Sequence, residues 1–466
     1  MLRTLTLLCL SLGTAQAKAA PSEANIRNFG AIGDGKADDT AAIQKAVDSG
    51  LGDIRLPKGD YRITQPIVID LDKLGFTSIH GNGVATIIMD GPGPALKFVG
   101  THFKSADPEG FEAKVWQQQR MPLVDGLGIL GRHPKSVGIE AVGTMQLTIT
   151  RVHIRQAWHG IHLRENNRNV IISNCHIYEN RGIGIYYDDV NLHQSNITAC
   201  HISYNHRGGI VSRAGNVRNI HITGCDIESN MHPQAPATAN VLIDCTNSPY
   251  GTGEVAITGC TIQHNHLSPD SANIRILSRS NKPRSSLQTE PTIVREGNVT
   301  ITGNVLSDVM VNIHLRDCRS AAITGNTLWK GYQHNLLIEG CSNVVIGPNC
   351  FDRNPRYGPH NGPVAHNSLI VRNSEDCTLT GLHISNALNA PAALLIENCR
   401  RMNITNCTIL DYDNVGLLLK NLSHSRVSGC LIRDDRPNAV SVPMRIVGGK
   451  NNMITDNALG LGNSDN

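Results

Sequence analysis

This 466-residue sequence has few aromatic residues, a small net charge and no long hydrophobic run after its first residues. Aromatic residues make up 4%, which is low for a globular enzyme and suits a narrow core filled by aliphatic side chains. The formal net charge of +3, without any recognised motif, argues against a nucleic-acid partner. No later stretch approaches the ~20 apolar residues of a transmembrane helix, so we expect no membrane span.

The cysteines include no Cys-x-x-Cys pair, and therefore no pattern that indicates a zinc site. Apart from Cys9, most are spaced like the repeat described below, which favours small apolar core positions over disulfides. Disulfides remain an alternative if the protein is exported.

Residues 1–17 have the pattern of a secretory signal peptide. Arg3 supplies the positive start, Leu5–Leu12 the short apolar core, and Ala15-Gln16-Ala17 a small-x-small cleavage site. We therefore predict a secreted or periplasmic protein.

One short phrase recurs along the chain: Ile or Val, Thr or Ser, a small or polar residue, then Cys or Asn. The first repeats follow one another at about 25 residues, a period that marks a solenoid. Each phrase alternates inward and outward residues, which is the periodicity of a strand. The phrase begins at Ile172, Ile197, Ile222, Ile257, Ile301, Ile323, Ile404, Val427 and Ile454.

A second short strand follows in each repeat, as in Gly160–Leu163. Two or three short strands per turn of about 22–25 residues predict an all-β solenoid, a parallel β-helix whose coils stack at about 4.8 Å. Like residues then form ladders, and we expect those of Cys175, Cys200 and Cys225 to lie inside. Asparagines after the phrase are expected to adopt left-handed turns and to stack as well; these are Asn180, Asn205, Asn230 and Asn265.

The repeats predict about a dozen coils between residues 122 and 460. We expect a signal peptide over 1–17, an N-terminal cap with the first coils over 18–121, and coils with loop insertions over 122–466. Long insertions often line the binding face of a solenoid. Their predicted positions are residues 231–239, 278–296 and 353–366.

A distinct motif precedes the coils. It runs Phe29-Gly-Ala-Ile-Gly-Asp-Gly35 and continues Asp38-Asp-Thr-Ala-Ala-Ile-Gln44. Asp38 or Asp39 can cap a helix whose apolar stripe, Ile43, Ala46 and Val47, would cover the open end of the solenoid. The motif closely resembles the opening of the pectate-lyase-like β-helix superfamily, the group with rhamnogalacturonases, exo-polygalacturonases, β-1,3-glucanases and phage tailspikes.

This resemblance covers about forty residues. It implies a right-handed single-stranded parallel β-helix with an N-terminal capping helix, usually secreted, acting on polysaccharide and often a homotrimer. It transfers no catalytic site, because the Gly-Asp-Asp and Gly-His-Gly motifs of polygalacturonase-type members are absent: Asp188-Asp189 follows Tyr186-Tyr187, and His159-Gly160 follows Trp158. We interpret the acidic residues of the N-terminal motif as turn and cap residues.

The coil register also predicts which residues point outward from the second strand. An outward aliphatic ladder needs cover, so the polar coils between about residues 160 and 316 form the better site. One predicted row is His162, Gly184, Val211, Leu242, Arg275, His314, followed by aliphatic residues; the other is Arg164, Tyr186, Arg213, Asp244, Leu277 and Arg316.

The candidate site residues come from these rows. Arginine suits an anionic sugar chain because its guanidinium binds carboxylate or sulfate as a fork. Structural roles remain alternatives: Asp188 and Asp189 can end a strand, and Asp244 can pair with Arg213. The predicted catalytic residues are Tyr186, Asp188, Asp189, Arg213 and Asp244, and the predicted substrate-binding residues are His162, Arg164, Arg275, His314 and Arg316.

Three functions remain open. The main hypothesis is a polysaccharide lyase or glycoside hydrolase; a lyase removes a proton beside a uronate carboxylate and needs a base and a cation, in some cases Ca²⁺. A hydrolase needs two carboxylates, and Asp188 or Asp189 with Asp244 is the nearest pair. A uronate epimerase and a non-catalytic glycan-binding β-helix are the alternatives.

Overall fold

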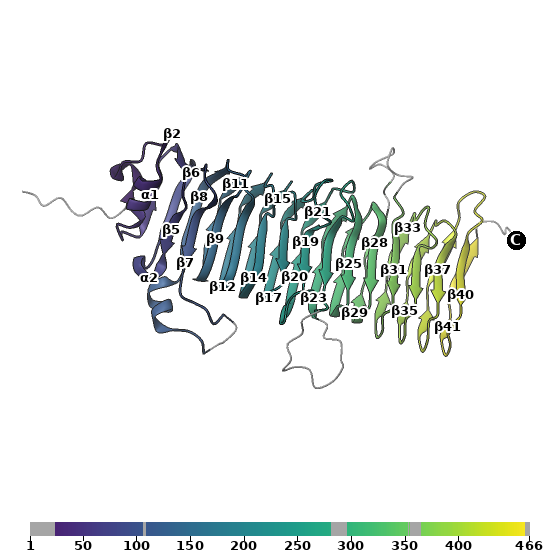
Figure 1. Ribbon diagram of the computed structural model, residues 1–466. Helices are drawn as coiled ribbons and strands as arrows, with labels where there is room; N and C mark the ends of the chain where they lie inside the picture. Colours follow the sequence, from purple (N-terminus) through teal and green to yellow (C-terminus); the bar gives the residue numbers. More distant parts are fainter. Residues whose placement is uncertain (1–23, 106–108, 281–295, 353, 355–364, 462–466) are drawn as a thin grey trace, which may run out of the picture.

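The computed structural model describes residues 24–105, 109–280, 296–352, 354 and 365–461, which form one elongated solenoid (Figure 1). Its 42 strands belong to one hydrogen-bonded network, and consecutive coils pair in parallel along the axis. The predicted all-β parallel β-helix is therefore confirmed, and about a dozen coils follow residue 122, as the repeat period requires.

Short elements close the N-terminal end. Ile43, Ala46 and Val47 of α1 (Thr40–Val47) are buried against the core, so the predicted capping helix is confirmed. The other elements of this end are β1 (Ala24–Asn25), η1 (Ile26–Phe29), β2 (Asp34–Asp38), β3 (Asp53–Arg55), β4 (Gly59–Ile63), β5 (Ile67–Asp70), α2 (Leu71–Leu74), β6 (Ser78–Met89), β7 (Gly93–Val99), η2 (Val115–Gln119) and β8 (Leu123–Gly131).

Stack A contains the recurring phrase, which forms one strand in each coil and places its Ile or Val in the core. Its strands are β10 (Thr148–Thr150), the second halves of β12 (His159–Ser173) and β14 (Ile185–Thr198), β17 (Asn216–Thr223), β20 (Gly251–Thr258), β23 (Gly297–Thr302), β26 (Arg319–Thr324), β29 (Ser342–Ile346), β32 (Thr378–Thr380), β35 (Asn403–Thr405), β38 (Arg426–Ser428) and β41 (Met453–Thr455).

Stack B follows each phrase after a bend. Its strands are β11 (His153–Arg155), β13 (His176–Tyr178), β15 (His201–Ser203), β18 (Asp226–Glu228), β21 (Thr261–Gln263), β24 (Val305–Ser307), β27 (Thr327–Leu328), β30 (Cys350–Phe351), β33 (His383–Ser385), β36 (Thr408–Leu410), β39 (Leu431–Asp434) and β42 (Ala458–Leu461).

Stack C holds the second strand of each repeat and runs from β7 to β40 along the solenoid (Figure 1). After β7 its strands are β9 (Ser136–Met145), the first halves of β12 and β14, β16 (Ile210–Arg213), β19 (Ala239–Asp244), β22 (Ala272–Leu277), β25 (Val309–Arg316), β28 (Gly331–Glu339), β31 (Ser368–Arg372), β34 (Leu394–Glu397), β37 (Val415–Lys420) and β40 (Val442–Val447).

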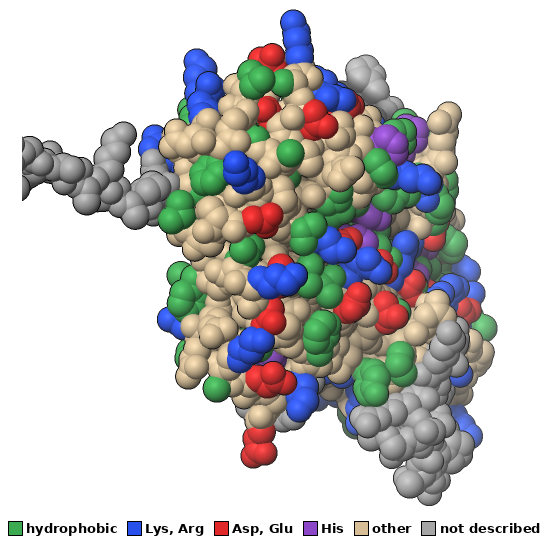
Figure 2. Space-filling model, turned by 60° about the vertical axis from the view of Figure 1, so that its left-hand side comes forward, with side chains coloured by type: hydrophobic (Ala, Val, Ile, Leu, Met, Phe, Trp, Pro, Cys, Tyr) green, Lys and Arg blue, Asp and Glu red, His purple; other side chains and the backbone are tan. Residues whose placement is uncertain are grey.

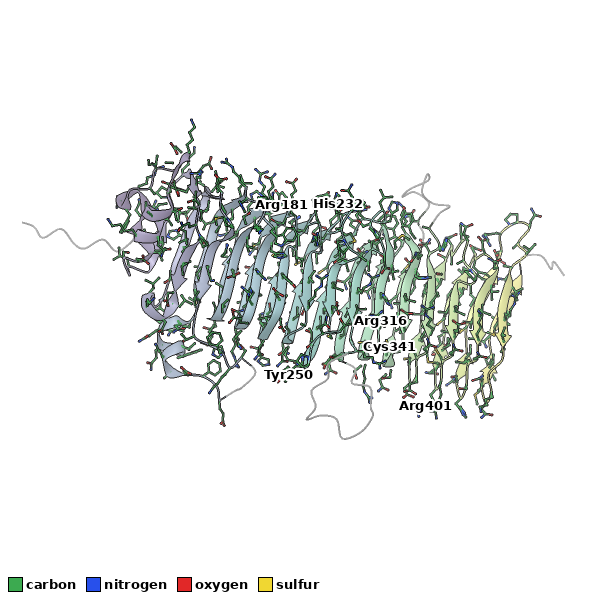
Figure 3. The ribbon with its side chains drawn as sticks, in the orientation of Figure 1. Arg181, His232, Tyr250, Arg316, Cys341 and Arg401 are labelled. Carbon is green, nitrogen blue, oxygen red and sulfur yellow. The ribbon has the colours of Figure 1, made fainter. Side chains whose placement is uncertain are left out.

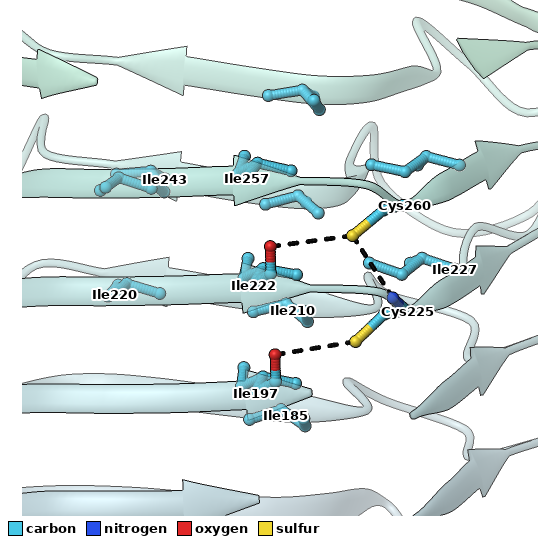
Figure 4. Packing of buried hydrophobic residues seen from close by; sticks show 14 of the residues in the cluster. Ile185, Ile197, Ile210, Ile220, Ile222, Cys225, Ile227, Ile243, Ile257 and Cys260 are labelled. Carbon is cyan, nitrogen blue, oxygen red and sulfur yellow. Dashed lines mark hydrogen bonds between the residues drawn. The ribbon is translucent and has the colours of Figure 1, made fainter. Parts of the chain in front are cut away.

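The cysteines of the phrase lie inside, as predicted. In Figure 4 the thiol of Cys260 contacts the carbonyl of Ile222 at 3.7 Å, and the N–H of Cys225 donates to the Cys260 Sγ at 3.4 Å. Among the described residues the cysteines are free thiols, and all but Cys350 are buried. They act as small apolar ladder residues with weak thiol donors.

The asparagine ladder differs from the prediction in one respect. Asn180, Asn205 and Asn230 are fully buried and stacked, and each side-chain amide donates to the next at 2.7–2.9 Å. The left-handed residue is the one before each asparagine, such as Tyr204 with φ 58°. The buried amide satisfies the backbone groups that the bend leaves unpaired.

Asn265 does not join this ladder, contrary to expectation. Its side chain accepts from the N–H of Leu267 at 3.0 Å, and Asn240 takes the next place after Asn230 and donates to the carbonyl of His264 at 3.0 Å. The ladder continues instead through Asn240, Asn273, Asn312 and Asn335.

The acidic residues of the N-terminal motif have structural roles, as interpreted from the sequence. Asp39 accepts from the N–H groups of Ile32 and Gly33 at 2.6 and 3.0 Å. Asp38 accepts from the N–H of Thr40 at 3.0 Å and so caps the start of α1.

The predicted signal segment 1–17 and most of the insertions predicted at 278–296 and 353–366 lie outside the described residues. In the part of the chain that the structure describes, no helix combines the length and apolarity needed to cross a membrane.

Candidate functional site

The strand register corrects the predicted outward rows of stack C in one coil. His162 pairs with Tyr186, and Arg164 pairs with Asp188. Gly184 was expected beside His162, so the prediction for this coil is wrong by two residues. The step from His162 to Tyr186 is 24 residues, whereas Gly184 lies only 22 residues after His162, and a shift of two keeps the same side chains outward. Tyr186 therefore belongs to the first row and Asp188 to the second.

A histidine stands between two carboxylates at the centre of this surface. His162 Nε2 lies 2.9 Å from Asp188 Oδ2, and its Nδ1 lies 3.6 Å from Glu140 Oε2. The Lys97 ammonium lies 3.3 Å from the other oxygen of Glu140, and the Arg164 guanidinium 3.6 Å from Oε2. Because an ionised carboxylate only accepts, His162 donates from Nε2 to Asp188.

Glu140 was not predicted. It pairs with His162 in the register of β9 and β12 and is 6% exposed. Continuing the outward row one coil towards the N-terminus would have identified it, because the same alternation holds in β9.

Tyr186 is the second group of the cluster. Its ring stacks on His162 with centroids 5.3 Å apart and an interplanar angle of 3°. Burial raises the pKa of Tyr186 to about 12, the Asp188 carboxylate adds to that rise, and Arg213 opposes it. The hydrogen bond from His162 lowers the pKa of Asp188, which is therefore ionised at neutral pH. The phenol thus lies beside an anion that favours its protonated form and a cation that favours its phenolate.

His159 completes the polar cluster as a neutral imidazole. Burial lowers its pKa to about 3, with His162 as a further cause. Its Nδ1 accepts from the N–H of Ile183 at 3.1 Å, so the ring proton is on Nε2. The ring lies 5.1 Å from that of Tyr186, between centroids. His159 can therefore donate to a ligand but has no free lone pair with which to accept a proton.

Arg207 lies 5.0 Å from the centre of the Trp158 ring and forms a cation–π pair at the edge of this surface. Figure 3 separates the two edges of the solenoid: Arg181 and His232 lie along the upper one, and Tyr250 and Arg316 lie towards the lower one.

Two predicted catalytic residues, Asp189 and Asp244, accept hydrogen bonds from the backbone of turns. Asp189 has a left-handed φ of 45° and accepts from the N–H of Gly215 at 3.0 Å. Asp244 accepts from the N–H of Thr246 at 3.0 Å, and no ion pair joins it to Arg213 among the described residues. Asp188 and Asp244 are two coils apart in the register, or roughly 10 Å, which is just beyond the separation of about 6.5–9.5 Å in inverting hydrolases.

Tyr187 lies inside the solenoid, where its hydroxyl is 2.6 Å from Ser195 Oγ. It is therefore unavailable to a ligand on the outward face. The turn at Asp189 and Gly215 borders a pocket of about 440 Å³ that includes Tyr250.

Arg275 and His314, predicted to bind substrate, belong to a separate buried network. Arg275 Nε lies 3.2 Å from His314 Nδ1, and its Nη2 lies 2.8 Å from Asp270 Oδ1. His314 Nε2 is 2.7 Å from Glu339 Oε2, and Arg372 Nε donates to Glu339 Oε1 at 2.7 Å. These side chains satisfy one another, so the structure separates them from the cluster at Tyr186.

This network predicts a pH-dependent stability. Hydrogen bonding from His314, and then from Arg372, lowers the pKa of Glu339 to about 2 from its usual 4.5. Because the pKa of Glu339 is lower in the folded than in the unfolded chain, its ionised carboxylate stabilises the fold at pH values above about 4.5. This stabilisation is lost as the pH falls from about 4.5 towards 2. Urea unfolding at pH 7 should show Glu339→Gln to be less stable by on the order of 2–3 kcal/mol.

The difference between wild type and Glu339→Gln should shrink as the pH falls below 4.5. Glu397→Gln, which removes a more exposed ion pair with Lys420, is the matched control and should cost under about 1 kcal/mol. A Glu339→Gln deficit that stays constant from pH 7 to pH 3 would contradict this interpretation.

The charged surface has no single sign. Figure 2 shows acidic, basic and histidine side chains mixed on the flank at the right of the view. Among the described residues, no group of three or more His, Cys, Asp or Glu side chains is arranged to hold a metal ion. The Ca²⁺ considered for a lyase remains a prediction.

Two family models match parts of the chain. The model described as "Right handed beta helix region" matches residues 132–250 and 359–463, and that of the periplasmic copper-binding protein NosD matches residues 256–390. Both matches lie within the coils.

Two curated proteins of Azotobacter vinelandii match a short segment. Mannuronan C5-epimerase AlgE3 is 52% identical over 44 residues, which is 9% of this chain and 2% of the epimerase. Alginate lyase 7 is 52% identical over 46 residues, 9% of this chain and 5% of the lyase. The chain therefore matches only a small part of these relatives.

Among solved structures, tailspike protein 3 of bacteriophage CBA120 superposes with a TM-score of 0.50. It is 16% identical and the alignment covers 93% of this chain and 61% of the tailspike. At this identity the similarity concerns the fold alone. Together with the parallel coils and the matched family model, it shows that the chain has the fold of a right-handed parallel β-helix.

Proposed function

We propose that this chain is a polysaccharide lyase that cleaves a uronate-containing chain at the surface around Tyr186. The observation that carries the proposal is the placement of the Tyr186 phenol beside Asp188 and Arg213 on the outward face of stack C. A lyase needs a proton-transferring group and a cation, and this cluster contains both.

The reaction follows from these groups. The Tyr186 phenolate removes the proton on C5, beside the uronate carboxylate, and the C–H electron pair forms the C4–C5 double bond. The C4–O4 bond breaks, and the phenol returns its proton to O4. Arg213 stabilises both the phenolate and the charge that develops on the uronate carboxylate, while His162 holds Asp188 in place.

One proton-transferring residue on one face favours elimination over epimerisation. The same phenol can serve first as base and then as acid when the proton and the leaving oxygen are on one side of the ring. An epimerase must deliver a proton to the opposite face, and His159, a neutral imidazole whose remaining proton is on Nε2, is too weak an acid to supply it. Epimerisation is the second candidate, because the matched segments come from mannuronan C5-epimerases as well as an alginate lyase.

Incubation with a panel of polysaccharides tests the proposal. Alginate, pectate, sulfated polysaccharides and neutral glucans are compared by absorbance in the unsaturated-uronate band and by mass spectrometry of the products. Unsaturated oligomers from a uronate substrate are the expected result. Reducing ends without that absorbance would show a hydrolase, and deuterium incorporation at C5 without cleavage would show an epimerase; either result would contradict the proposal.

Location and assembly belong to the same proposal. A polysaccharide substrate is met outside the cytoplasm, which agrees with the predicted signal peptide over 1–17 and with a secreted or periplasmic protein. A homotrimer remains a prediction, which light scattering can test.

A further inference from the structure

A small cationic pocket lies on the same surface as the proposed reaction centre, several coils towards the C-terminus. It has a volume of about 210 Å³ and is lined by Thr246, Leu277, Arg279, Arg316 and Asp317. Arg316 belongs to the same outward row as Asp188, through the register partners Arg213, Asp244 and Leu277.

The strand register gives the distance between the proposed reaction centre and the pocket. Four coil steps separate Asp188 from Arg316 in the same row, which corresponds to roughly 19 Å along the axis. A polysaccharide chain that lies along stack C would therefore reach the pocket several sugar units away from the bond at Tyr186.

Within the described part of the chain, the strand neighbours of Arg316 do not compensate its charge. On one side its register partner is the apolar Leu277. On the other side it is Glu339, whose two oxygens are already taken by His314 and Arg372. Arg316 is exposed and forms no ion pair with a described residue.

Arg279 adds a second guanidinium to the pocket. It is exposed and likewise forms no ion pair within the described ranges. Asp317 contributes one carboxylate, so the lining carries two positive charges and one negative charge. Two forked donors in a pocket of this size suit one acidic group rather than a neutral sugar ring.

We infer that Arg279 and Arg316 form a distal subsite for the acidic group, carboxylate or sulfate, of a sugar unit several positions from the cleaved bond. The inference rests on the proposed function, because it assumes that the polysaccharide lies along stack C from Tyr186. The subsite binds long chains and is not reached by short ones.

The test compares the double variant Arg279→Gln/Arg316→Gln with wild type on uronate oligosaccharides of increasing length. For long chains KM should rise about 10- to 100-fold with kcat nearly unchanged, because each lost charged hydrogen bond weakens binding. For the shortest cleaved chains both constants should match wild type. Arg155→Gln, an exposed arginine of stack B, is the matched control and should behave as wild type.

Calorimetric binding of uronate, sulfated and neutral oligosaccharides to wild type and the double variant identifies the acidic group. Loss of affinity in the variant for uronate chains, or for sulfated chains, assigns the subsite to carboxylate or to sulfate. Equal loss for neutral chains, or a double variant that matches Arg155→Gln on long chains, overturns the inference. Absence of activity in wild type would contradict the proposed function instead, while the binding comparison would still decide the subsite.

Discussion

Tyr186→Phe should lower kcat/KM for the uronate substrate by about 10²–10⁴-fold, the range for losing a group that transfers a proton in the transition state. The ring and its stacking on His162 remain, so binding should change little and the loss should be in kcat. Initial rates from the absorbance of unsaturated products measure the effect. Tyr204→Phe, which removes the hydroxyl of an exposed tyrosine near Glu228, is the control and should keep full activity.

The pH dependence of kcat/KM distinguishes a Tyr186 phenol that acts as the base from one that has only a structural role. With a Tyr186 pKa of about 12, only a small fraction is phenolate at neutral pH, so kcat/KM should rise with pH. Asp188→Asn removes a cause of the raised phenol pKa and should move that rise to lower pH. A Tyr186→Phe variant with wild-type kcat, or a flat profile from pH 6 to 10, would show that the site is elsewhere.

Asn205→Ala should destabilise the fold more than Glu339→Gln does. The Asn205 amide donates to the carbonyl of Ile177 at 3.1 Å and to Asn230 at 2.7 Å, and its oxygen accepts from both the backbone and side chain of Asn180. Removing it leaves several buried polar groups without partners, at about 1–3 kcal/mol each. We expect a loss of about 3–6 kcal/mol in the free energy of unfolding, measured in urea.

Thr223→Ala, at an exposed position of stack A, is the matched control and should change stability by less than about 0.5 kcal/mol. If Asn205→Ala costs no more than this control, the ladder is not a source of stability. The repeat would then be held by its aliphatic core alone.

The ladder shows which side-chain directions can be predicted from the sequence. The recurrence of Cys and Asn after each phrase placed Cys175, Cys200 and Asn205 inside, because period-two alternation and a constant coil length leave one choice of face. The left-handed position was misplaced by one residue, because Tyr204, and not Asn205, occupies the bend. Bend geometry depends on the partner amide of the next coil, which a single repeat does not contain.

The residues of the candidate site were likewise predicted only in part from the sequence. The sequence identified His162, Tyr186, Asp188 and Arg213, since all lie on the outward face of neighbouring coils. It could not show that the Asp189 carboxylate accepts a hydrogen bond from the turn at Gly215. Nor could it show that Glu140 faces His162 from the preceding coil. Those facts depend on contacts between residues that the repeat does not relate to one another.

The sequence by itself determined the solenoid, its cap and the inward ladders, because these follow from a periodic pattern that each coil repeats. Only the tertiary structure decided which outward side chains meet. The register between β12 and β14 places Tyr186, and not Gly184, beside His162, where the two rings stack. Likewise, the two carboxylate oxygens of Glu339 bond to His314 and Arg372. Arg316 therefore has no ion-pair partner among the described residues. These outcomes depend on the register between coils and on competition for partners across coils, and neither is periodic.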